Sequence, residues 1–168
     1  RYWLGIALLH ADLAAATQVL TRAHNGFVST RDRLGRALSA AALINVVYFE
    51  YDQFERMAPW LAELDELDRA GLRLDAPSDE IAVLGAIIQA ALFQAPAHPR
   101  LLPAVRRMRT LLSAPVDVNH RISAAIPLLI YANLIADLPL GDWLLDNVAD
   151  LVSDSRLTPL NQAYWWLF

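Results

Sequence analysis

The stretch LINVVYFEYD at residues 43–52 points to the fold, because three other stretches of the chain are similar to it. They are LGIALLHAD at residues 4–12, LGAIIQA at residues 84–90 and LLIYANLIAD at residues 128–137. Each pattern predicts an apolar helix, followed by a short turn and a more amphipathic helix. The leucines that open the four stretches are 39, 41 and 44 residues apart, and another step of about 40 reaches the last aromatic run. The spacing therefore predicts four helix pairs and the start of a fifth.

Composition supports helices throughout the chain. Of the 168 residues, 56% are hydrophobic, and Ala and Leu together are more than a third. Sustained alternation and hairpin turns, which would indicate strands, do not occur in the sequence. We therefore predict an all-α fold: a right-handed superhelical array of antiparallel helix pairs with repeats of about 40 residues. Residues 1–168 are expected to be one helical-repeat domain and a fragment of a longer protein, because aromatic residues occupy both ends.

The predicted helix boundaries depend on capping residues and prolines. The Asn-Gly pair at residues 25–26 is interpreted as a helix stop, and Asp52 with Glu55 as a capping box. Pro59 and Pro127 fall inside predicted helices, so we expect a bend or a boundary within a turn of each. The expected helices span residues 2–10, 12–25, 31–50, 53–70, 79–94, 100–113, 118–135, 141–153 and 159–168.

Charge and cysteine content exclude several classes of function. All fourteen basic residues are Arg, and 18 acidic residues bring the net charge to −4. That balance argues against nucleic-acid binding and against a polybasic membrane patch. The lack of cysteine excludes disulfides, thiolate catalysis and cysteine metal sites. Residues 81–97 contain no Asp, Glu, Arg or His, and we interpret them as a buried helix rather than a membrane span. We therefore predict no direct nucleic-acid or membrane contact for this part of the protein.

The acidic side chains at residues 63–68 could hold a divalent cation. Asp65 and Asp68 share one face of a predicted helix, as the two carboxylates of a metal site would. A second pair, Asp146 and Asp150, could complete such a site in an all-helical enzyme. Leucines at helical spacing supply a buried stripe on the same predicted helix, so we favour a solvated outer face and predict no metal. The histidines have no metal-ligand spacing and are assigned structural or surface roles: His10, His24, His98 and His120.

Two further clusters have both a structural and a functional interpretation. The four arginines of residues 100–109 could bind phosphate or an acidic partner, but a solvated helix face is our prediction. The terminal aromatic run could be a binding surface, and we expect instead that it packs against a following repeat. The residues of the two clusters are Arg100, Arg106, Arg107 and Arg109, then Tyr164, Trp165, Trp166 and Phe168.

The helix pairs resemble tetratricopeptide-type repeats. Trp-Leu-Gly at residues 3–5, with Ala16, Leu20 and Ala23 behind it, carries this resemblance, and residues 43–54 are a looser match. The period here is longer than the family's, which is about 34 residues. Longer repeats of this kind resemble the superhelical sensor region of large bacterial signal-transduction ATPases, including LuxR-related and antibiotic-regulatory activators. The resemblance implies a cytoplasmic, effector-responsive helical array beside an ATPase module and a DNA-binding module, with a role in transcription regulation.

The resemblance also implies a concave groove lined by the first helix of each pair. The positions two and five residues after each anchor leucine would face it: Ile6 and Leu9, Asn45 and Tyr48, Ala86 and Gln89, and Ile130 and Asn133. Three of these are amides in apolar helices, and buried amides need partners. They either clamp neighbouring helices or bind a peptide or a small ligand. The candidate groove residues are His10, Asn45, Tyr48, Gln89 and Asn133.

We therefore predict a non-catalytic domain without catalytic residues or cofactors, which binds a protein, a peptide or a small effector. One alternative is an all-helical small-molecule-binding or metal-dependent enzyme domain that uses the acidic helix faces. Another is a structural module that associates with copies of itself through exposed repeat ends.

Overall fold

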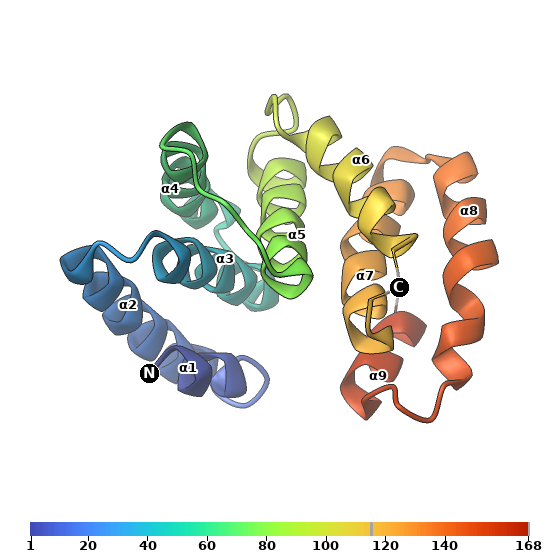
Figure 1. Ribbon diagram of the computed structural model, residues 1–168, viewed down its shortest axis with the longest axis horizontal. Coiled ribbons are helices and arrows are strands. Elements are labelled where there is room, and N and C mark those ends of the chain that lie inside the picture. Colours follow the sequence, from blue (N-terminus) through green and yellow to red (C-terminus); the bar gives the residue numbers. More distant parts are fainter. Residues whose placement is uncertain (115, 168) are drawn as a thin grey trace.

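The computed structural model describes residues 1–114 and 116–167, which form helices joined by short turns (Figure 1). No strand occurs in this part of the chain, so the all-α prediction is confirmed. Two of the elements, η1 and η2, are short 3-10 helices. The elements are α1 (Tyr2–Leu8), α2 (Leu13–Thr30), α3 (Arg33–Glu50), η1 (Phe54–Met57), α4 (Ala58–Arg69), α5 (Pro77–Gln94), α6 (Leu101–Leu112), α7 (Val118–Ile135), α8 (Leu138–Val148), η2 (Ala149–Ser153) and α9 (Pro159–Leu167).

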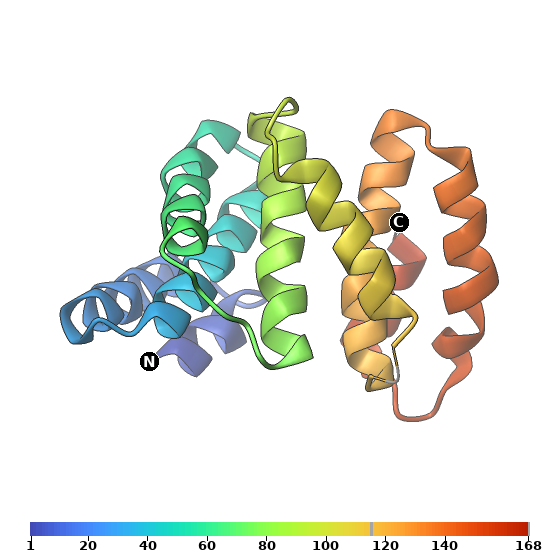
Figure 2. The ribbon, with the colours of Figure 1, turned by 45° about the horizontal axis from the view of Figure 1, so that its top comes forward.

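Helices that are neighbours in the chain pack as pairs. The pairs are α1 with α2, α3 with α4, α5 with α6, and α7 with α8, and α9 packs against α7. Each of α2, α4 and α6 also contacts the first helix of the next pair, and α3, α5 and α7 contact one another in succession. Figures 1 and 2 show the pairs following one another from α1 and α2 on one side to α7 and α8 on the other. The first helices therefore lie together, and the second helices lie outside them.

Aspartate side chains begin four of the helices. Asp12, Asp32 and Asp117 each accept a hydrogen bond of 2.9 Å from a backbone N–H in the first turn of α2, α3 and α7. Asp137 caps α8 in the same way at 3.1 Å. The predicted capping box at Asp52 is wrong, because the chain turns through left-handed backbone conformations there and η1 begins without a side-chain cap.

The predicted helix stop at residues 25–26 is also wrong. Helix α2 continues to Thr30 and ends at Arg31, whose backbone is left-handed with φ of 57°, one residue before Asp32 begins α3. An Asn-Gly pair costs a helix only about 1 kcal/mol, which the packing of α2 on α1 and α3 outweighs. Helix α4, by contrast, does end at a glycine, because Gly71 follows it with φ of 76°.

The two prolines inside predicted helices have different outcomes. A boundary does fall beside Pro59, because η1 ends at Met57 and α4 begins at Ala58. No boundary falls at Pro127, which lies inside the continuous helix α7 and is buried. A Cβ atom at Gly85 of α5 would lie 3.2 Å from Cγ of Pro127. The glycine therefore lets α5 and α7 approach closely at the proline ring.

The hydrophobic core lies on both sides of α3. On one side, Leu43 and Val46 pack with Leu9 and Leu20 of the first pair. On the other side, α3 joins the larger core that continues through α5 and α7 to Trp165 of α9. The anchor leucines are not equivalent, since Leu43 and Leu128 are buried whereas Leu4 is 56% exposed. None of the helices in the described part of the chain combines the length and apolarity that crossing a membrane requires.

Candidate binding groove

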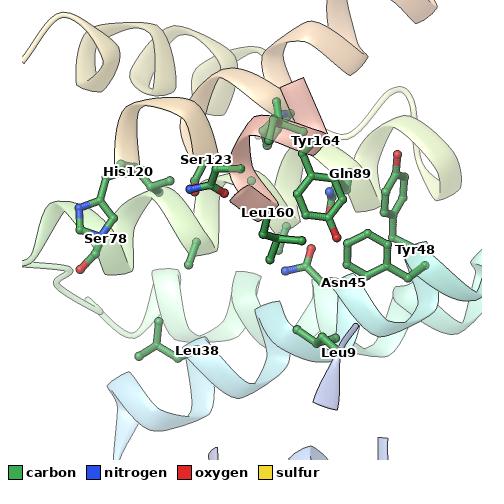
Figure 3. A pocket seen from close by; sticks show the side chains of 18 of the residues that line it. Leu9, Leu38, Asn45, Tyr48, Ser78, Gln89, His120, Ser123, Leu160 and Tyr164 are labelled. Atoms are coloured by element: carbon green, nitrogen blue, oxygen red, sulfur yellow. The ribbon is translucent and has the colours of Figure 1, made fainter. Parts of the chain in front are cut away.

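A groove with a volume of about 480 Å³ lies among the first helices of the pairs (Figure 3). Among the described residues, its lining comes from α1 and the turn after it and from α3, α5, α7 and α9. No lining residue comes from the second helices α2, α4, α6 or α8. This volume is in the range of small-molecule sites, about 300–1,000 Å³. The stacking of the pairs therefore gathers parts of the chain from Tyr2 to Tyr164 around one cavity.

Four of the five candidate residues line this groove. His10 follows α1, Asn45 and Tyr48 come from α3, and Gln89 comes from α5. Asn133 does not line it and is exposed near the end of α7. Helix α7 reaches the groove with its first half, through His120, Ser123, Ile126 and Pro127. Asn133 is seven residues beyond Ile126, about 10 Å further along the helix, and so it lies past the groove.

Asn45 and Gln89 bring two amides with unused hydrogen-bonding capacity to one end of the groove. Gln89 is only 7% exposed, and its Oε1 atom is fully enclosed without a hydrogen-bond partner in the described part of the chain. Asn45 is partly exposed, and its side chain makes no hydrogen bond to the described residues. Figure 3 shows both side chains beside Tyr48 and Tyr164. We call this region the amide end.

Aromatic rings form a wall at the amide end. The Tyr164 hydroxyl lies 2.9 Å from Nδ1 of His10, which joins residues 154 positions apart in the chain. The rings of Tyr164 and Phe49 are stacked with their centroids 5.9 Å apart, and His10 meets Phe49 edge-on at 5.4 Å. Burial raises the pKa of the Tyr164 phenol and lowers the pKa of His10, so both are uncharged at pH 7. The wall therefore presents apolar faces and neutral polar groups.

The opposite end of the groove is polar and acidic. Ser78 and Asp79 begin α5 there, and His120 begins α7, as Figure 3 shows for the serine and the histidine. Burial, together with the charge of Asp79, raises the pKa of Tyr2 to about 12. No Arg lines the groove within the described part of the chain. Asp79 is thus the one carboxylate among the described lining residues, and no guanidinium group accompanies it there.

The acidic patch on α4 is partly engaged by basic side chains. The Asp65 carboxylate accepts a 2.9 Å hydrogen bond from Arg100 and lies 2.9 Å from Nε2 of His98. Arg36 of α3 donates to Glu63 at 2.7 Å. The prediction of a solvated face holds for Glu66 and Asp68, which are exposed, but not for the partly buried Glu63 and Asp65, because sequence spacing does not show which helix packs alongside. Among the described residues, no three His, Asp or Glu side chains are placed to hold a metal ion.

The predicted basic cluster is likewise divided among separate partners. Besides the Arg100 contact, Arg107 donates two hydrogen bonds to Glu80 at 2.6 and 2.8 Å. Arg109 lies over the ring of Trp143 at 4.4 Å. Three of the four arginines therefore contact groups of neighbouring helices. Arg106, Arg107 and Arg109 are nevertheless exposed, so the prediction of a solvated helix face is confirmed for them and wrong only for the half-buried Arg100.

The terminal aromatic run does not act as one unit. Trp165 is 7% exposed and joins the core of this chain, and Tyr164 lines the groove. Both contacts correct the expectation that the run is left for a following repeat. Trp166 remains 74% exposed, and Phe168 lies outside the described residues.

Other lining residues had no distinctive signal in the sequence. Leu38 and Ser123 are an ordinary leucine and an ordinary serine in helical segments, and Asn161 lies in the last helix near the groove. Only the rule that first helices face inward could have found them, with the register of each helix known. A comparison of the chain with protein-family models, with curated proteins and with solved structures finds no match.

Proposed function

We propose that this chain is a non-catalytic binding domain whose groove takes up a small effector molecule. The observation that carries the proposal is the amide end, where one cavity is lined by two amides, Gln89 with a buried oxygen and Asn45, neither of which has a hydrogen-bond partner there among the described residues. A polar group that is buried and unsatisfied costs about 1–3 kcal/mol. Rotation of the amide would bring this oxygen to the cavity, and an occupant of the groove that completes its hydrogen bond there would recover that cost.

A small molecule fits the groove better than an extended peptide does. The contact between His10 and Tyr164 brings the first and last parts of the chain together at the amide end. A peptide lying along the groove would have to pass this contact or break it. The volume of about 480 Å³ suits an enclosed small ligand.

The context that we propose is a cytoplasmic, bacterial regulator of transcription in which this domain is the sensor. Support for it comes from the tetratricopeptide-like pattern of helix pairs and from the succession in which the pairs pack. A right-handed superhelical array would place the first helices on its concave side, and this agrees with the helices that line the groove. Substituting a groove residue in the native gene should change the transcript levels of regulated genes, while expression of the protein stays normal.

Binding is tested with Nile red, an uncharged planar dye whose emission shifts to the blue in apolar sites. We expect saturable binding with one dye per chain. Ser123 lies in the middle of the groove, and the variant Ser123→Trp should fill the space and abolish binding. Ser113 is exposed at the end of α6, away from the groove, so Ser113→Trp is the matched control and should bind normally.

Circular dichroism spectra and melting curves establish that both variants are folded. Equal binding by the two tryptophan variants, or no saturable binding by the wild-type chain, would contradict the proposal that the groove is the site.

A further inference from the structure

The charge of the groove restricts what it can bind. The described lining contains the carboxylate of Asp79 and no Arg, although the chain carries fourteen basic residues, all of them Arg. Burial lowers the pKa of His10, so this ring adds no positive charge at pH 7. A phosphate or carboxylate would lose its hydration here without gaining a strong cation, which is unfavourable. The groove therefore selects against anions.

The amide end provides both donors and acceptors. Each amide side chain has an oxygen that accepts and an NH₂ group that donates. The last torsion of a glutamine side chain is broad, so rotation of the Gln89 amide can turn either group toward the groove. Asn45 on α3 offers a second amide without a partner among the described residues. A ligand group that donates and accepts together can satisfy both side chains.

The aromatic wall favours a flat, apolar molecular body. Figure 3 shows Tyr164 beside Asn45 and Gln89, and the Tyr164 ring stacks on that of Phe49, which also lines the groove. Further aromatic groups pack favourably against such rings. The small side chain of Ala86 leaves space along α5. The apolar body and the polar group of a ligand would thus find their partners at the same end.

We propose that the groove binds an uncharged, planar, aromatic molecule that carries an amide-like donor and acceptor, with its ring against Phe49 and Tyr164 and its polar group between Asn45 and Gln89. This inference rests on the proposed function, because it names the class of effector for the same groove. Asp79, at the opposite end of the groove, repels the corresponding acid from a distance. A ring whose polar group cannot donate leaves an acceptor of the amide end unsatisfied.

Three compounds with one ring system test this inference: 2-naphthamide, N,N-dimethyl-2-naphthamide and 2-naphthoate. Isothermal titration calorimetry at pH 7.5 should show 2-naphthamide binding at least about tenfold more tightly than 2-naphthoate, and more tightly than the dimethylamide, since a site that hydrogen-bonds its ligand rejects an analogue without the donor. Comparable affinity for the amide and the acid would overturn the inference.

Variants then assign the preference to particular side chains. Gln89→Leu should weaken 2-naphthamide binding about tenfold and bring its affinity close to that of 2-naphthoate. Gln94 lies on the same helix outside the groove lining, so Gln94→Leu is the control and should bind normally. Asp79→Asn should reduce the difference in affinity between 2-naphthamide and 2-naphthoate. If Gln89→Leu still binds 2-naphthamide more tightly than 2-naphthoate by the same factor as the wild-type chain, the inference is also wrong.

Failure of this inference can be separated from failure of the proposed function. If Nile red binds, Ser123→Trp blocks it and 2-naphthamide does not bind, the groove is a binding site for another class of ligand. If neither Nile red nor any naphthalene compound binds, both proposals are wrong.

Discussion

Replacing Gln89 by Leu should make the protein more stable. The substitution removes the enclosed Oε1 atom that has no partner in the described chain, and such an atom costs about 1–3 kcal/mol. Leu and Gln have similar helix propensities and volumes, so α5 should be little disturbed. We expect a gain of about 1–2 kcal/mol, which for a chain of this size raises the melting temperature by roughly 2–8 °C.

Urea unfolding followed by circular dichroism measures this change. The midpoint should rise while the dependence on urea concentration stays constant, because a changed slope would report a change in the exposed surface rather than in stability. Gln18 is exposed on α2, and Gln18→Leu, the matched control, should change stability by less than about 0.5 kcal/mol. A loss of more than about 1 kcal/mol in Gln89→Leu would refute the reasoning and make the amide a clamp between helices.

Three further predictions test the fold by unfolding measurements. Gly26→Ala should stabilise the protein by about 0.5–1 kcal/mol, because α2 continues through residue 26 and the space beside it is open. Gly35→Ala should destabilise it, because the added Cβ would overlap an aromatic ring of α2. If Gly26→Ala destabilised the protein and Gly35→Ala stabilised it, a helix stop at residues 25–26 would again be the better interpretation. Asp137→Ala should cost about 1 kcal/mol by removing the cap of α8, and Asp52→Ala, which caps no helix, should stay within about 0.5 kcal/mol. Burial lowers the pKa of His24 in the folded protein. As the pH drops below about 6.5, this histidine takes up a proton more readily in the unfolded chain than in the folded one, so stability should fall. An equally steep fall in the His24→Gln variant would exclude this histidine as the cause.

Local sequence patterns were enough to predict the helix pairs. Apolar stretches at regular spacing act within a few residues, and they located the paired helices, including the start of α7 at Val118. The Asn-Gly pair at residues 25–26 failed because its local preference is weak compared with the packing of α2 on two neighbours. Local signals are thus reliable only where tertiary contacts do not oppose them.

The groove could be predicted only in part. The inward position of the first helices led to Asn45 and Gln89, but the contact of Tyr164 with His10 joins residues 154 positions apart, and no local pattern encodes it. The prediction that Asn133 faces the groove was wrong because Leu128, the anchor leucine of α7, is not aligned with Leu84, the anchor leucine of α5. In this structure Pro127, and not Leu128, lies against Gly85. Register along a helix depends on such contacts, which spacing in the sequence does not specify.

Two features that reduce stability meet in the groove. Among the described residues, the enclosed oxygen of Gln89 has no hydrogen-bond partner, and Asn45 places an amide without a hydrogen bond in an apolar helix. Stacked helix pairs do not need the two amides, because leucine or alanine would pack there without any unsatisfied group. Natural proteins commonly retain such costs where function requires them. Because both amides line one cavity, binding in the groove accounts for them better than a purely structural role does.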